Sequence, residues 1–231
     1  MRKQLFILLF TCISFQLVSA QTTMSDSLLH LRDSTLRAKD SSYRAMFQTD
    51  SIKVEKEFAD KAKWERVEAK AQYPLLKGSK NSGVIPVKDI NEIPDPNIDY
   101  KILFELTGNN PDSTAKEVNA GLDEIARVIN LHIASGIPAK RILPVIVVHA
   151  AALHVLKNNE AYQKKYKLDN PNIKLIDDLK KIGAKFIACG QAMEFFEIKK
   201  EEFLPDIKIS LTAQTVLTHY QLKGYVWHPL W

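Results

Sequence analysis

Apolar positions in the second half of the chain form short runs of strand length that alternate with longer stretches of helical spacing. The strand-like runs cover 101–107, 142–148, 185–189, 207–209 and 225–227, and the helix-like stretches cover 114–135, 150–166, 172–182, 190–196 and 212–222. The run at 142–148 is apolar at almost every position, which is typical of a strand buried on both faces of a parallel sheet. The alternation predicts an α/β fold, a three-layer sandwich with a mostly parallel sheet.

The chain before these runs has a different pattern. Residues 21–73 contain no Gly or Pro and are rich in Ser, Asp, Lys, Ala and Glu, which indicates a helical or partly disordered arm. Apolar residues at 54, 58 and 64, separated by charged ones, predict an amphipathic helix. A heptad line through Leu29, Leu36 and Tyr43 is too short for a convincing coiled coil. The arm is interpreted either as a solvated tether or as a segment that binds a partner.

A segment rich in Pro and Gly separates the arm from the alternating pattern. Residues 74–98 contain four prolines and two glycines, which break regular structure and are typical of a linker. We therefore expect an α/β domain at 99–231.

The first twenty residues form an apolar segment with a basic start. Arg2 and Lys3 precede an apolar stretch, and Val18-Ser19-Ala20 supplies small residues before Gln21. This pattern predicts a secretory signal peptide at 1–20 rather than a membrane anchor, because polar residues interrupt the stretch and a span needs about 20 mainly apolar residues. The mature chain is expected to be exported, periplasmic if the source has two membranes, and without a membrane span. Lipid modification of Cys12 is the alternative.

Composition narrows the classes of protein. The chain has 231 residues, of which 45% are hydrophobic, and only two cysteines, so disordered and disulfide-stapled classes are excluded. Removal of Arg2 and Lys3 with the signal peptide lowers the formal net charge from +5 to +3. Because basic residues are interspersed with acidic ones, we expect no binding of nucleic acid.

Candidate chemistry lies where the predicted strands end, since ligands gather at the carboxyl edge of an open parallel sheet. Cys189, the one cysteine left after signal removal, ends the third strand just before Gly190-Gln191 begins a helix. A thiol at a helix N-terminus faces free N–H groups that favour the thiolate. His149 ends the second strand, and Thr107 to Asn110 follow the first. Cys189 could also be an inert buried residue, and His149 a structural histidine.

Several other kinds of site are disfavoured. A metal site combining Cys189 with His149 or His219 lacks closely spaced ligands, so no metal is expected. Gly108 stands alone after the first strand, which fits neither a dinucleotide-binding fingerprint nor a P-loop. The nucleophile motif Gly-x-Ser-x-Gly of serine hydrolases is absent. We therefore expect no bound cofactor.

Five stretches together resemble the DsrE/DsrF-like family over about residues 99–231. They are Val147-Val148-His149-Ala150-Ala151-Ala152, Asp169-Asn170-Pro171-Asn172, Lys185-Phe186-Ile187-Ala188-Cys189-Gly190-Gln191, Leu204-Pro205 and Gly224-Tyr225. The resemblance implies an α/β sandwich that forms trimers or hexamers. In the sulfur-relay members of the family it further implies a cysteine that accepts sulfur as a persulfide, and Cys189 is the matching position. The surroundings Cys-Gly-Gln are similar to a less characterised, often exported branch.

Two hypotheses of function follow. The first is a thiol-based sulfur carrier or sulfurtransferase-like protein, with Cys189 as nucleophile, His149 as base or hydrogen-bond partner, and Gln191 orienting the sulfur. Its partners would be sulfur donor and acceptor proteins. The second is a noncatalytic oligomeric binding module of the cell envelope, whose arm engages the partner. An enzyme of another kind, binding a small ligand in the loop after Leu106, is a third alternative.

Overall fold

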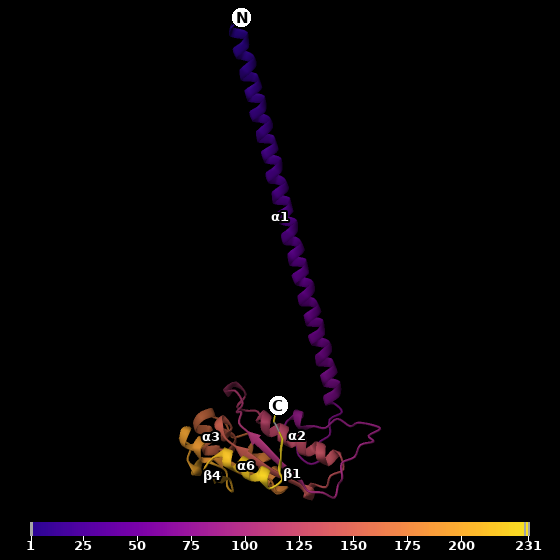
Figure 1. Ribbon diagram of the computed structural model, residues 1–231, viewed down its shortest axis with the longest axis vertical. Helices are drawn as coiled ribbons and strands as arrows, with labels where there is room; N and C mark the ends of the chain where they lie inside the picture. Colours follow the sequence, from indigo (N-terminus) through magenta and orange to yellow (C-terminus); the bar gives the residue numbers. More distant parts are fainter. Residues whose placement is uncertain (1, 229, 231) are drawn as a thin grey trace. The chain divides into compact units, whose positions relative to one another are not determined.

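The computed structural model describes residues 26–228 and Leu230, and includes residues 2–25 only in the bounds of its first helix. The expected signal peptide at 1–20 lies outside the described residues. The chain divides into two compact units, 1–64 and 65–231. Helix α1 (Arg2–Glu68) is continuous (Figure 1). Every side chain from 26 to 66 is exposed. Among the described residues, no helix is both long enough and apolar enough to cross a membrane.

The second unit is built on a five-stranded sheet in which all strands are parallel. The strand order is β4-β3-β2-β1-β5. The strands are β1 (Tyr100–Leu106), β2 (Ile142–Val148), β3 (Lys185–Cys189), β4 (Lys208–Ser210) and β5 (Val226–His228). The expected mostly parallel sheet is confirmed, with each strand within two residues of its predicted bounds.

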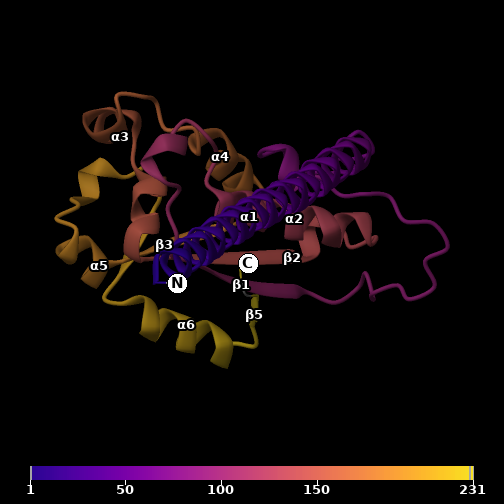
Figure 2. The ribbon, with the colours of Figure 1, turned by 90° about the horizontal axis from the view of Figure 1, so that it is seen from above.

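Helices cover both faces of the sheet, as expected for a three-layer sandwich. Figure 2 shows α2 (Ala120–Ala134) and α4 (Ile173–Lys181) on one side of the strands and α6 (Ala213–Leu222) on the other. The other helices are α3 (Asn159–Tyr166) and α5 (Gly190–Phe195). Short 3-10 helices are η1 (Lys80–Ser82), η2 (Asp112–Thr114), η3 (Ala139–Arg141), η4 (Ala150–Leu156) and η5 (Lys200–Glu202).

Alternation along the strands divides the core between the two faces. Phe104, Ile146 and Phe186 pack with α2, α4 and η4 in the larger cluster. Val145 and Val147 point to the opposite face and pack with α6. Each of these side chains is almost fully buried, and each such burial contributes roughly 1.5–3 kcal/mol. The near-continuous apolar run of β2 is therefore explained by burial on both sides.

Two α-helices begin later than the sequence indicates, because an asparagine caps each of them further along the chain. Helix α2 was expected from residue 114, yet it starts at Ala120, where the Asn119 side chain accepts the Leu122 N–H at 3.1 Å. The stretch 150–166 divides into η4 and α3, and the Asn158 side chain caps α3 through the Ala161 N–H at 2.9 Å. Asn is a strong N-cap because its oxygen satisfies an otherwise free backbone donor.

Part of the expected linker packs against the domain. Leu76 is 1% exposed and belongs to the larger core cluster. The fully buried Asn130 of α2 accepts the Leu76 N–H at 2.9 Å and donates to the carbonyls of Leu76 and Ser82. A short antiparallel bridge joins Gln72 to Val84. Residues 72–84 are thus tied to α2, whereas residues 85–99 are exposed.

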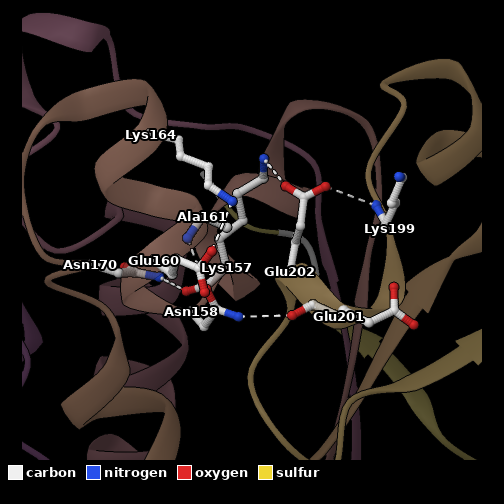
Figure 3. A network of polar contacts seen from close by, with 9 residues as sticks. All are labelled: Lys157, Asn158, Glu160, Ala161, Lys164, Asn170, Lys199, Glu201 and Glu202. Carbon is white, nitrogen blue, oxygen red and sulfur yellow. Dashed lines mark hydrogen bonds and ion pairs between the residues drawn. The ribbon is translucent and has the colours of Figure 1, made fainter.

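A polar network joins the start of α3 to η5 (Figure 3). The Lys157 ammonium contacts the Glu202 carboxylate at 2.9 Å, and the Lys199 N–H donates to the other oxygen of Glu202 at 3.0 Å. Asn158 donates its backbone N–H to the Glu202 carbonyl and its side-chain amide to the Glu201 carbonyl. The network fixes the segment after β2 to the segment before β4.

These contacts determine the charge state of Glu202. Its partial burial would by itself raise its pKa, but the Lys199 N–H and the Lys157 ammonium outweigh that effect and hold the pKa below its usual range. A carboxyl whose pKa is depressed by folding stabilises the protein above its unfolded-state pKa, and this stabilisation is lost as the pH falls through the folded-state value.

We predict that Glu202→Gln lowers the free energy of unfolding at pH 7 by about 1–2 kcal/mol, because the nearly buried Lys157 ammonium loses its charged partner. The deficit relative to wild type should shrink as the pH falls below the usual range of a glutamate and through the lower folded-state pKa of Glu202, because the carboxyl is then protonated in both states. Denaturant titrations at pH 7 and at a pH below that pKa measure this. Glu201→Gln is the control, since the Glu201 side chain is exposed and only its carbonyl joins the network. An equal deficit at both pH values would contradict the ionic explanation.

Candidate functional site

The carboxyl ends of the strands meet at one edge of the sheet, where strand order reverses. The chain runs from β1 through β4 in one direction and then returns to place β5 on the other side of β1. In register, Leu106 lies opposite Val148, and Val148 lies opposite Ala188. His149 follows Val148 and Cys189 follows Ala188, the last pair between β2 and β3. The two predicted site residues therefore lie at neighbouring positions, with strands about 4.8 Å apart.

Cys189 is the last residue of β3 and its side chain faces α6. It is 5% exposed and packs in the smaller cluster with Val147, Ile187 and Ala213. Its Sγ accepts the backbone N–H of Ala213 at 3.3 Å. Ala213 is the first residue of α6, so the helix terminus that contacts the sulfur belongs to α6, whereas the sequence indicated α5. An N–H donor at a helix N-terminus favours negative charge on the sulfur.

The chain between β4 and α6 lies directly against the residue that follows the thiol. A Cβ added to Gly190 would lie 2.7 Å from the Ser210 carbonyl oxygen and 3.4 Å from that of Leu211. Glycine is therefore required here by close approach of two backbones. The Gln191 N–H donates to the Leu211 carbonyl at 3.1 Å, while the Gln191 side chain is exposed. Gln191 thus holds the chain between β4 and α6 through its backbone N–H and not through its side chain.

His149 is paired with a carboxylate that the sequence analysis did not include. Its Nε2 lies 2.9 Å from Glu105 Oε1, and both side chains are about one-fifth exposed. The next residue, Ala150, has φ 52°, a left-handed conformation that costs a non-glycine residue free energy and is concentrated at functional sites. Among the described residues, the hydrogen bond that Cys189 Sγ accepts comes from the Ala213 N–H and not from His149. The structure brings both residues to one edge without a direct bond between them.

Glu105 could have been found from the sequence. It interrupts the apolar strand β1, and its place two residues after the buried Leu103 puts it on the face that carries Cys189 and α6. An ionisable residue within a buried strand needs a partner, and a histidine at the end of the neighbouring strand is within reach. Glu105, His149 and Cys189 consequently share one face on three adjacent strands.

A pocket of about 260 Å³ opens at the end of β1. It is lined by Glu105, Leu106, Thr107, Gly108, Asn109, Asn110, Asn119, Ala120, Gly121 and Leu230. The loop after β1 that the sequence indicated as a contributor to the site forms one wall, and the first residues of α2 form another. Cys189 does not line this pocket, so the edge carries two separate features, a covered thiol and an open cavity.

Asparagines fix the wall of this pocket. Asn110 Oδ1 accepts the Ala120 N–H at 3.1 Å, and its amide donates to the carbonyls of Glu117 and Val118. The Asn119 amide donates to the Gly108 carbonyl at 3.1 Å. The side-chain amides are thereby used in holding the loop, which makes it a preformed wall.

A partly buried histidine, His154, lies near the same loop. Desolvation, together with the nearby charges of Lys165 and Lys157, lowers the pKa of His154 to about 4, so the imidazole is neutral at pH 7. Its ring packs edge-on against Tyr166 and Phe196. Tyr166 accepts the Asn109 amide at 3.0 Å, so the aromatic cluster supports the loop after β1.

Two comparisons with known proteins found similar proteins or families. One solved structure to which the chain is similar is that of a protein of unknown function, MTH1491 from Methanobacterium thermoautotrophicum. It is 16% identical, with a TM-score of 0.42, and the match covers 57% of this chain and 99% of that one. No curated protein matches the chain. The model of the DsrE/DsrF-like family matches residues 101–227, which is more than half of the sequence. The chain belongs to the DsrE/DsrF-like family.

Proposed function

We propose that this protein is an exported, thiol-based sulfur carrier that holds sulfur as a persulfide on Cys189. The observation that supports this most directly is the place of the Cys189 sulfur, at the carboxyl end of β3 with the Ala213 N–H directed at it. The same donor would stabilise the terminal negative charge of a persulfide. Membership of the family supports the same reading.

The reaction balances with a sulfane-sulfur donor such as thiosulfate. The Cys189 thiol loses its proton, and the thiolate attacks the outer sulfur of thiosulfate. The S–S bond of thiosulfate breaks, its electron pair leaves with sulfite, and a new S–S bond forms on Cys189. The proton passes to the His149 imidazole, which Glu105 orients through the 2.9 Å contact, or to water. No redox partner is needed, because the transferred sulfur keeps its oxidation state relative to the donor.

We predict that the mature protein gains one sulfur atom when incubated with thiosulfate, and that Cys189→Ser gains none. Intact mass spectrometry before and after treatment with a reductant measures the adduct. His149→Ala should slow the gain roughly tenfold or more if the imidazole accepts the proton. His219→Ala is a matched control, since His219 is an exposed histidine on α6. Absence of any Cys189-dependent adduct with thiosulfate or polysulfide would contradict the carrier function.

Access to the sulfur requires a local movement. Cys189 is buried, and the residues closest to it include Ala213 and, across the β3–β4 pair, Ser210. The segment 210–212 between them is held to the α5 start by the bond from the Gln191 N–H. Leu211 itself is 75% exposed, so its side chain does not anchor the segment in the core. We therefore propose that this segment covers the thiol and opens to admit donor and acceptor.

Gly190→Ala should open this cover. The new Cβ would meet the Ser210 carbonyl at 2.7 Å, and the overpacking is expected to raise the rate of native-state alkylation of Cys189 about tenfold. Gly108→Ala is the control, because a Cβ there meets no atom within 4 Å. Labelling with an uncharged reagent, followed by mass, gives the rates, and circular dichroism confirms that both variants are folded. Equal rates in wild type and Gly190→Ala would show that another path reaches the sulfur.

We also propose that the protein self-associates, which is the shared element of the carrier and the binding-module hypotheses. Large apolar side chains are exposed on α6, β5 and the segment before α6, namely Leu211, Leu222, Val226 and Trp227. Leu222 is 84% exposed and also lines a shallow groove with His219 on the outer side of α6. Clustered exposed apolar side chains are typical of interaction surfaces.

Light scattering of the mature protein is expected to give the mass of a trimer or hexamer. Leu222→Glu should shift the distribution toward smaller species, because it would place a charge in the apolar contact. Leu168→Glu is the control, because Leu168 is a leucine 43% exposed that follows α3 and lies outside this set of side chains. A monomer at all concentrations would contradict self-association, whereas association without sulfur transfer would favour the noncatalytic binding module.

A further inference from the structure

We infer that the pocket at the end of β1 is a binding site for a small molecule that carries an ammonium group. Cys189 does not line the pocket, although Glu105 lines it and also contacts His149. The pocket lies beside β1, where the strand order reverses. Open α/β sheets bind ligands outside the carboxyl ends of their strands at such switch points. The cavity therefore lies at the place in the sheet where proteins of this fold class bind ligands.

The size of the cavity limits the ligand. At about 260 Å³ it is below the roughly 300–1,000 Å³ of pockets that hold drug-sized molecules, and it holds on the order of nine waters at about 30 Å³ each. Leu106 and Leu230 supply apolar lining. A compact molecule with one charged end and a short carbon skeleton fits this space.

The charge of the lining selects the sign of the ligand. Glu105 is the one ionisable residue among those that line the pocket. One of its oxygens contacts His149 Nε2, which leaves the other oxygen for a donor from the ligand. The side-chain amides of Asn110 and Asn119 already donate to backbone carbonyls of the loop after β1, so they are not free to bind a ligand. At the start of α2, Asn110 and Asn119 already accept the Ala120 and Leu122 N–H groups. The Glu105 carboxylate is then the charged group among the described lining residues, which favours an ammonium group over a carboxylate or phosphate.

Ethanolamine, acetamide and acetate are the probes, since they compare an ammonium, a neutral amide and an anion of similar size. In amide NMR titrations of the full mature chain, ethanolamine should produce saturable shifts at Gly108 and Gly121, while acetate should not. Glu105→Gln should weaken ethanolamine binding about tenfold or more, as expected for loss of a charged hydrogen bond. Glu117→Gln is the matched control, because Glu117 lies on the same loop and its side chain is exposed.

A second pair of variants keeps the test decisive if Glu105→Gln is poorly folded. Ala120 lines the pocket and is exposed at the first position of α2. Ala120→Glu should tighten ethanolamine binding about threefold and Ala120→Lys should weaken it by a similar factor, as expected for one charge nearby in water. Acetate or acetamide binding as well as ethanolamine, or no response to any of these changes, would overturn the inference. Because Ala120 is not part of the Glu105–His149 contact, the Ala120 variants test the pocket independently of sulfur transfer, which Cys189→Ser tests.

Discussion

The burial of β2 on both faces is the constraint on which the rest of the molecule depends. Its apolar side chains alternate between the larger cluster with α2 and α4 and the smaller cluster with α6. Because β1 and β3 pair with it in parallel and in register, their carboxyl ends lie at the same height. Glu105, His149 and Cys189 are brought to one face by this pairing and by the two-residue period of the strands. The chemistry of the edge is thus a consequence of how the sheet is packed.

In the proposed carrier function, burial and reactivity oppose each other at Cys189. The small cluster under α6 contributes packing energy, and the same packing removes the sulfur from solvent. The Ala213 N–H offsets part of this by directing a donor at the sulfur, which an inert cysteine in an apolar core would lack. In our proposal the segment 210–212 reconciles burial with reactivity. It is held mainly through backbone contacts, so that its opening would expose the sulfur without disturbing the core.

The sequence predicted the fold well because its signals are local and repeated. The apolar run of β2 and the strand that ends at Cys189 each carry their own period and their own stop. The sequence placed the start of α2 at residue 114 instead of 120. The cap at Asn119 depends on a loop held by Asn110, and a contact between residues nine or ten positions apart gives no periodic signal in the sequence. For the same reason the partner of Cys189 was expected on α5 and lies on α6. Glu105 was within reach of sequence reasoning, whereas the pocket that it lines required the return of the chain to β5.

The hydrogen bonds of the Asn130 side chain with Leu76 and Ser82 form a clasp that determines whether a cut chain would separate into two pieces. Residues 72–84 are tied to α2 by this buried amide and by the burial of Leu76, while residues 85–99 run exposed between two anchored ends. A protease that cleaved the exposed stretch would break one covalent bond without releasing either piece, because the clasp lies on the arm side of the cut. Helix α1 would therefore stay attached to the nicked domain through noncovalent contacts alone, and the fragments would separate only on denaturation.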